Sequence, residues 1–374
     1  MNKMKVMTIL GTRPEIIRLS ACIKACDKYF DHILVHTGQN WDYTLNEVFF
    51  KDLELREPDY FLNSVGDTLG ETMGNIIAKS YEIMQKEMPE AILLLGDTNS
   101  ALSAISAKRL KIPIFHMEAG NRCWDWNVSE MINRKIVDHI SDINLPYTEH
   151  SRRYLLSEGI DGKTIFVTGS PMREVLRDHM EKINESNVIE HLGLQKKKYI
   201  LLSAHREENI DIEDNFISLM NSINYIAEKY QMPIIYSMHP RSKKHIEQRG
   251  FVFHPLVQGM KPFGFIDYNF LQMNAYCVLS DSGTLSEEST MLGFPGVLIR
   301  TSTERPEVLD HGTVVIGGIT GQDVEQALEL AVKMYDNNED TVIPDDYEDT
   351  NVSIKVVKLI QSYTKIVNIT TWMK

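Results

Sequence analysis

Residues 91–98 read Ala-Ile-Leu-Leu-Leu-Gly-Asp-Thr (AILLLGDT), five apolar residues in succession followed by a small polar turn. A strand with one face in water alternates apolar and polar residues, whereas consecutive apolar residues are typical of a strand covered on both faces. Such strands belong to parallel sheets with helices on either side. The stretch therefore predicts an α/β fold and places Asp97 just beyond the carboxyl end of a buried strand.

Runs of the same kind recur along the chain, separated by amphipathic segments that predict helices. The predicted strands are Lys5–Leu10, His32–Thr37, Ala91–Leu95, Ile112–Met117, Asp142–Leu145, Thr164–Val167, Tyr199–Ser203, Pro233–Met238, Tyr276–Leu279, Val297–Arg300 and Thr313–Ile316. So many strands in one sheet would be unusual, and 374 residues exceed what one core usually serves. We therefore expect two doubly wound domains.

The change-over between the domains is expected near Gly169-Ser170-Pro171. The last amphipathic segment, Val352–Tyr363, has no strand after it and is expected to pack back on the first domain. The predicted domains are thus 1–169 plus 352–374, and 170–351.

Composition excludes several classes of partner. A net charge of −13 argues against nucleic acid and anionic membranes, and no apolar run approaches the length of a membrane span. The amino terminus has no signal-peptide core, and the four cysteines lack zinc-ligand spacing. We expect reduced thiols, a cytoplasmic location, no metal, and neither a dinucleotide nor a P-loop motif.

Three carboxylates follow predicted strands or open a helix: Asp97, Glu118 and Glu130. Asp97 could instead be a helix N-cap, and Glu130 an ordinary acid of a first helical turn. If the three converge, burial and like charge would raise at least one pKa and provide an acid or base near neutrality.

Cationic residues follow the other predicted strands, where the ligand crevice of a doubly wound sheet lies. They are Arg13, Arg18, His205, Arg206, His239 and Arg305. Each could contact an anion, but surface salt bridges, a structural histidine or an ion pair at a helix start explain them as well.

Residues 280–290 (SDSGTLSEEST) predict a strand end, a turn and a helix start. Backbone N–H groups of Ser282, Gly283 and Thr284 are suited to an anion, and Glu288 lies about one turn further on. Glu287 is expected to face elsewhere.

Together these stretches resemble the non-hydrolysing UDP-N-acetylglucosamine 2-epimerase family. The matching motifs, which run in family order over nearly the whole chain, are GTRPEIIR (11–18), HTGQ (36–39), GDT (96–98), HMEAG (116–120), EMINR (130–134), VTGSP (167–171), AHREEN (204–209), DSGTLSEE (281–288), LGFP (292–295) and TERPE (303–307).

The resemblance implies a glycosyltransferase-B-like fold of two Rossmann-like domains facing a cleft, usually as a homodimer, without cofactor. It implies anti elimination of UDP from a UDP-2-acetamido sugar to a 2-acetamidoglycal, followed by re-addition with C2 inverted. Its catalytic positions fall on Asp97, Glu118, Glu130 and His205. Its substrate and UDP positions fall on Arg13, Arg18, Gln39, Arg206, His239, Tyr268, Ser282, Gly283, Thr284, Glu288 and Arg305.

Several positions depart from the common family pattern. Arg18 replaces Lys, Glu207 replaces Arg, Thr284 replaces Gly, and HTGQN replaces a TGQH pattern that belongs to a regulatory UDP-sugar site in some members. These variants and the 121–127 loop resemble the subgroup that makes UDP-N-acetyl-L-fucosamine from UDP-2-acetamido-2,6-dideoxy-β-L-talose for capsule or O-antigen. A UDP-GlcNAc/UDP-ManNAc epimerase, a glycosyltransferase of the same fold and a non-catalytic UDP-sugar-binding regulator are the alternatives.

Overall fold

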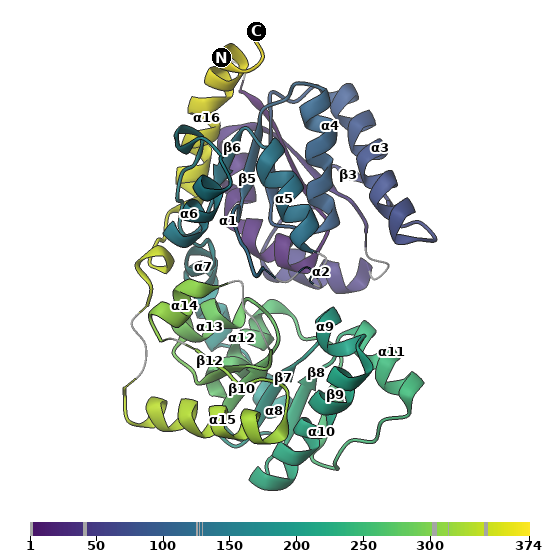
Figure 1. The fold of residues 1–374 in the computed structure, drawn as a ribbon, viewed down its shortest axis with the longest axis vertical. Helices are drawn as coiled ribbons and strands as arrows, with labels where there is room; N and C mark the ends of the chain where they lie inside the picture. The colour runs from purple at the N-terminus through teal and green to yellow at the C-terminus, as the bar shows by residue number, and fades with distance from the viewer. Residues whose placement is uncertain are drawn as a thin grey trace. The chain divides into compact units, whose positions relative to one another are not determined.

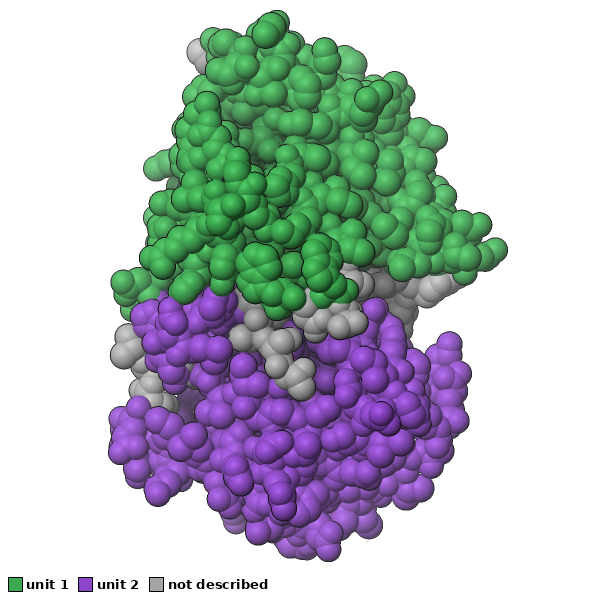
Figure 2. All heavy atoms as spheres, in the orientation of Figure 1, with its two compact units in different colours: residues 1–178, 345–374 green, residues 179–344 purple. Residues whose placement is uncertain are grey.

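The structure is a computed structural model that describes residues 3–39, 43–124, 126, 128, 130–300, 305–312, 314–339 and 343–374. The chain forms two compact units (Figures 1 and 2). Unit 1 comprises residues 1–178 and 345–374, and unit 2 comprises residues 179–344.

Unit 1 contains a six-stranded, wholly parallel sheet in the order β3-β2-β1-β4-β5-β6. Its strands are β1 (Lys5–Leu10), β2 (Asp31–His36), β3 (Tyr60–Phe61), β4 (Ala91–Leu95), β5 (Ile114–Met117) and β6 (Ile143–Leu145). Its helices are α1 (Arg13–Tyr29), α2 (Tyr43–Asp52), α3 (Leu69–Glu87), η1 (Asn99–Leu102), α4 (Ser103–Arg109), α5 (Glu130–Ile140), α6 (Glu149–Ser157), η2 (Gly162–Thr164), η3 (Asp345–Tyr347) and α16 (Val352–Thr370). The helix α7 (Met172–Asn184) begins in unit 1 and ends in unit 2.

Unit 2 repeats this plan with the parallel order β12-β11-β10-β7-β8-β9. Its strands are β7 (Ile200–Ser203), β8 (Ile234–Ser237), β9 (Val257–Met260), β10 (Cys277–Ser280), β11 (Gly296–Leu298) and β12 (Val315–Ile316). Its helices are α8 (Val188–His191), α9 (Glu207–Ile210), α10 (Glu213–Tyr230), α11 (Pro240–Arg249), α12 (Phe265–Asn274), α13 (Leu285–Leu292), α14 (Pro306–Asp310) and α15 (Gly321–Asp336).

Both sheets have the strand order 3-2-1-4-5-6 of the Rossmann fold, so the predicted fold class is confirmed. The order reverses between β1 and β4 in unit 1 and between β7 and β10 in unit 2. Ligands of open parallel sheets bind beyond the carboxyl ends of the strands at such a reversal. The polar clusters that follow these four strands therefore lie where the topology favours a ligand.

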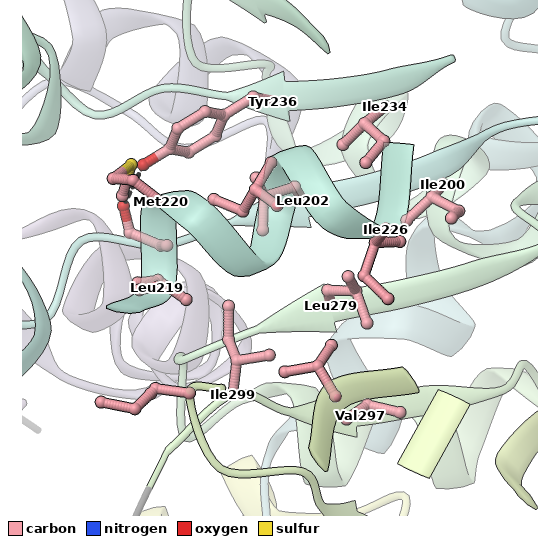
Figure 3. Close-up of a cluster of buried hydrophobic side chains, with 14 of the residues drawn as sticks. Ile200, Leu202, Leu219, Met220, Ile226, Ile234, Tyr236, Leu279, Val297 and Ile299 are labelled. Atoms are coloured by element: carbon pink, nitrogen blue, oxygen red, sulfur yellow. Dashed lines mark hydrogen bonds between the residues drawn. The ribbon is translucent and has the colours of Figure 1, made fainter. Parts of the chain in front are cut away.

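Each sheet has its own apolar core. In unit 2, α10 and α15 pack against each other and contribute apolar side chains to a cluster with the strands. Figure 3 shows Leu219, Met220 and Ile226 of α10 beside Leu202 and Leu279 of the sheet. All five are at most 2% exposed, which explains why these strands read as continuous apolar runs.

Two short strands were not predicted, and one predicted strand is absent. Residues 164–167 form only an isolated bridge between Ile165 and Asn144. The strand β3 has two residues, and β9 (VQGM) contains no buried residue. Strands of two and four residues are too short to show a recognisable pattern, which is why they were not predicted.

The boundaries between the units lie at 178/179 and 344/345, rather than at 169/170 and 351/352. Contacts of the 170–178 segment explain the shift: the Ser170 N–H donates to the Asp346 carbonyl (3.0 Å), and Glu174 of α7 accepts hydrogen bonds from Ser353. The last helix, α16, packs on α1, so the carboxyl-terminal segment does return to the first unit. No helix in the described parts of the chain is both long and apolar enough to cross a membrane.

Candidate functional site

Asp97, Glu118 and Glu130 converge in unit 1, as predicted. Asp97 follows β4 and Glu118 follows the adjacent strand β5, whose Met117 is in register with Leu95. Glu130 is the first residue of α5. Electrostatic interactions of Asp97 with both glutamates place the three carboxylates within range of one another.

Two guanidinium groups form ion pairs with carboxylates of this cluster. Arg134 of α5 donates from Nε to Asp97 Oδ2 (2.7 Å), and Arg18 of α1 forms a close ion pair with Glu118. The carboxyl group of Asp97 is not a helix cap, because Thr98 supplies the cap of η1. Burial raises the pKa of Asp97; the charges of Glu130 and Glu118 raise it further, and Arg134 opposes them. The unit thus contains the carboxyl group of raised pKa that the sequence predicted.

The turn that carries Glu118 has an unusual backbone. Glu118 has φ of +60°, a conformation that non-glycine residues rarely adopt, and Gly120 has φ of +84°. A Cβ atom on Gly120 would lie 2.5 Å from the Ser151 carbonyl oxygen, so only glycine fits. Asn121 donates to Glu118 Oε1 (3.1 Å) and accepts from the Ser151 hydroxyl (3.1 Å).

A buried ionic network supports this turn. Asp138 of α5 accepts from the Gly120 N–H (3.1 Å) and from Arg122 (2.8 Å), and it lies 3.0 Å from His116. Arg122, fully buried, also binds Glu158 through two nitrogens, at 2.9 and 2.7 Å. The hydrogen bonds from Arg122, together with other cations, lower the pKa of Glu158 to about 2 although burial opposes this. The network ties the Glu118 turn to the helix that carries Glu130.

The Gly11–Arg13 turn follows β1 at the reversal of strand order. A Cβ on Gly11 would lie 1.9 Å from Thr37 Oγ1, and Gln39 Cγ also lies against this position. Glu15, fully buried, accepts from the Gly11 N–H (3.0 Å) and the Thr12 hydroxyl (2.8 Å). Burial raises its pKa to about 7. Arg13, half-buried, lies 5.7 Å from the centroid of the Phe49 ring.

In unit 2, Asp281 organises the turn after β7. Its Oδ2 accepts from the backbone N–H groups of His205 and Arg206, both at 2.9 Å, because Ser280 and Ser203 are paired in neighbouring strands. Burial raises the pKa of Asp281. The His205 ring stacks on that of His239, which follows β8, with centroids 5.6 Å apart. The structure therefore brings both predicted histidines and Arg206 together.

The SDSGT turn links β10 to α13, as predicted. Its N–H groups are engaged in the turn: Ser282 N donates to the Ser280 hydroxyl (3.1 Å), and Thr284 N donates to the Ser282 hydroxyl (3.3 Å). An anion bound to these two groups would therefore replace serine hydroxyls as their acceptors.

The two glutamates of α13 have different neighbours. Glu287 is fully buried and lies 3.9 Å from Arg305, which is also 3.9 Å from Glu307. For Arg305 these distances match the ion-pair alternative. Glu288 accepts a hydrogen bond from Gln272 of α12 at 2.6 Å. Tyr268, half-buried, lies one turn earlier on the same helix.

Several residues of the site were missed from the sequence: Asn121, Arg122, Asn133, Arg134, Asp138, Gln272 and Asp281. Asn133, whose side-chain amide donates to the Asp97 carbonyl (2.9 Å), and Arg134 could have been found, because they lie three and four positions after Glu130 and so share its helix face. The others depend on contacts between distant segments. Within the described residues, no group of three His, Cys, Asp or Glu side chains could hold a metal ion, and no cysteine forms a disulfide.

Comparisons with known proteins agree with this geometry. The family model of UDP-N-acetylglucosamine 2-epimerase matches residues 24–361. The chain is 36% identical to UDP-N-acetylglucosamine 2-epimerase of Methanocaldococcus jannaschii over 87% of this chain and 92% of that protein. It is 33% identical to UDP-2,3-diacetamido-2,3-dideoxy-D-glucuronate 2-epimerase of Pseudomonas aeruginosa, over 87% and 91%.

Solved structures are similar over their whole length. UDP-N-acetylglucosamine 2-epimerase from Rickettsia bellii superposes with a TM-score of 0.91 and 45% identity, covering 100% of both chains. The M. jannaschii enzyme in complex with UDP-GlcNAc and UDP gives a TM-score of 0.89 and 31% identity, covering 96% of this chain and 99% of that one. These similarities agree with the glycosyltransferase-B-like fold expected for two parallel-sheet units.

Proposed function

Since the chain belongs to the UDP-N-acetylglucosamine 2-epimerase family and is an isomerase of UDP-sugars, we propose that it inverts carbon 2 of a UDP-2-acetamido sugar by eliminating and re-adding UDP. In the first half-reaction the C1–O bond breaks, a base removes the C2 proton, and UDP leaves with the bonding pair. In the second, a proton returns to the opposite face of C2 and the C1–O bond re-forms.

The observation that carries this proposal is the convergence of Asp97, Glu118 and Glu130 in unit 1. The C2 proton is weakly acidic, so C1–O cleavage must run ahead and build positive charge on the sugar, which carboxylates stabilise. Inversion also requires a proton acceptor on one face and a proton donor on the other. Asp97, whose pKa is raised by burial and by the charges of the two glutamates, is the member of the cluster best suited to carry a proton between the two faces.

The UDP end of the substrate is assigned to cationic groups and to the turns after the strands. His205, Arg206 and Arg13 would stabilise the leaving diphosphate by charge-assisted hydrogen bonds. We assign Tyr268 to the uracil ring and Glu288 to the ribose hydroxyls, with the SDSGT turn beside the phosphates. The remaining assignments, Arg18, Gln39, His239 and Arg305, stay predictions.

For the sugar, we propose UDP-2-acetamido-2,6-dideoxy-β-L-talose, with UDP-N-acetyl-β-L-fucosamine as product. UDP-GlcNAc and UDP-ManNAc fit the family membership equally well. The loop after the Glu118 turn favours the deoxysugar, because Trp124 and Trp126 are 58% and 66% exposed and could cover a 6-methyl group. A homodimer, a cytoplasmic location and a role in capsule or O-antigen synthesis stay predictions.

The direct test is to incubate the protein with each candidate UDP-sugar in D₂O and follow C2 by NMR. Deuterium at C2 together with the C2 epimer as product is expected for the L-talose sugar. Turnover of UDP-GlcNAc alone would favour the alternative substrate, and no exchange with any UDP-2-acetamido sugar would refute the proposal. Glu130→Gln should abolish exchange, whereas Glu149→Gln, at an exposed position on α6, is the matched control.

The role of the tryptophans is tested by the Trp124→Ala, Trp126→Ala double variant. It should raise KM for the L-talose substrate while leaving UDP affinity unchanged. Trp372→Ala, beyond the end of α16 in the same unit, is the control for loss of an indole. Unchanged kinetics in the double variant would remove the argument for the deoxysugar.

A further inference from the structure

The two neighbouring glutamates of α13 are held by chemically different partners. Glu287, fully buried, lies 3.9 Å from the guanidinium of Arg305, a cationic partner that it shares with Glu307. Glu288 receives the side-chain amide of Gln272 at 2.6 Å. An amide orients a carboxylate by a hydrogen bond but carries no charge to cancel its own.

Gln272 is well placed to hold a single geometry. Its side chain is fully buried on α12, and its chain neighbour Leu271 accepts a hydrogen bond at its carbonyl from the Tyr199 hydroxyl (2.6 Å). A carboxylate can only accept, so the Gln272 NH₂ group must face Glu288, which fixes the amide orientation. The contact joins α12 to α13 across 16 residues of sequence.

We infer that Gln272 is a positioning residue for nucleotide recognition, which fixes the carboxylate of Glu288 in the orientation that accepts hydrogen bonds from the ribose hydroxyls. The inference rests on the proposed function, because it takes the ligand of this turn to be a nucleoside diphosphate. Tyr268, assigned to the base, precedes Gln272 by one helical turn. One helix thus carries the group assigned to the base and the amide that orients the group assigned to the ribose.

The physical reason for an amide here is pre-organisation. A glutamate side chain has several rotamers, and those that point away from the ribose would reduce the affinity for UDP. A hydrogen bond to a charged group is among the stronger ones in proteins, so its removal should weaken UDP binding by about 10-fold to 100-fold. The effect should appear only with ligands that carry ribose hydroxyls.

The test compares the binding of UDP and 2′,3′-dideoxy-UDP by isothermal titration calorimetry. In the wild-type protein UDP should bind more tightly than the dideoxy analogue. Gln272→Met, which keeps the side-chain length, should weaken UDP binding about 10-fold or more and leave the dideoxy analogue nearly unchanged. The double variant Gln272→Met, Glu288→Gln should bind UDP no more weakly than Glu288→Gln alone, because both changes remove the same interaction.

Two further variants separate this role from damage to α12. Asn269→Leu removes another buried amide of the same helix, which donates to the Phe265 carbonyl (2.8 Å), and it should keep the wild-type ratio of UDP to dideoxy-UDP affinity. Gln272→Asn keeps the amide but shortens its reach, and it should behave like Gln272→Met.

The possible outcomes are distinguishable. A wild-type ratio of affinities in both Gln272 variants would overturn the inference while leaving the epimerase proposal intact. Wild-type protein that binds UDP and the dideoxy analogue equally would overturn the ribose assignment of Glu288, and wild-type protein that binds neither would overturn the nucleotide assignment itself.

Discussion

Glu15 should make unit 1 less stable as the pH rises, and replacing it with glutamine should remove this dependence. The carboxyl group is fully buried, and burial raises its pKa from 4.5 to about 7. Below 4.5 it is protonated in both the folded and the unfolded chain. As the pH rises from 4.5 to 7 the unfolded chain loses the proton first, so the folded state loses stability over this window and levels off above it.

The magnitude follows from the two pKa values. At about 1.4 kcal/mol for each pH unit, the difference between 4.5 and 7 corresponds to about 3 kcal/mol when the group is fully ionised. Roughly 1 kcal/mol of this is already lost at about pH 5.5. The stability of Glu15→Gln relative to the wild type should therefore increase by about 2 kcal/mol between about pH 5.5 and about pH 8. For a unit of this size that is about 4–8 °C in Tm.

Scanning calorimetry of both proteins over this pH range measures the difference. Glutamine can still accept from the Gly11 N–H and the Thr12 hydroxyl, so the turn keeps its acceptor. Glu149→Gln, on the surface, controls for the general loss of one negative charge. Parallel Tm curves for Glu15→Gln and wild type would refute the reasoning, because they would mean that Glu15 does not titrate near neutrality in the folded chain.

Three further substitutions test unit 1. Arg134→Met should raise the pKa of Asp97 further and lower kcat by at least about 100-fold, with the acidic limb of the pH–rate profile shifted to higher pH; an unchanged profile would contradict the role of this ion pair. Gly120→Ala should lower the free energy of unfolding by about 1–3 kcal/mol, because φ is +84° and the new Cβ meets the Ser151 carbonyl. A loss below about 0.5 kcal/mol would be inconsistent with this geometry. Arg122→Leu should cost about 3–5 kcal/mol by leaving buried carboxylates without their guanidinium, which thermal unfolding can measure.

The strands at the centre of both sheets were predictable because each is covered on both faces. Residues 91–95 are all at most 3% exposed. Every position of this strand is therefore occupied by an apolar residue, which makes the strand recognisable in the sequence. The turns after β1, β4, β7 and β10 were equally predictable, since parallel strands bring their carboxyl ends to one edge of a sheet. The convergence of Asp97 and Glu118 followed from this rule before any contact was known.

The ends and edges of the fold were not predictable in the same way. The strands β3 and β9 pair with β2 and β8 at the edges of the sheets, and with two and four residues they are too short to give a recognisable sequence pattern. The observed domain boundaries differ from the predicted ones because Ser170 and Glu174 form hydrogen bonds with Asp346 and Ser353. These residues come close only in the folded chain.

The sequence by itself determined the α/β class, the two sheets and the places where the polar clusters would meet. All of these follow from the pattern of apolar and polar residues, which can be recognised within each segment separately. Only the tertiary structure decided which group each charged residue would face: Arg134 for Asp97, Arg18 for Glu118 and Gln272 for Glu288. Such pairs depend on distances of a few ångströms between segments far apart in the chain, and the strength of a hydrogen bond falls steeply over that range.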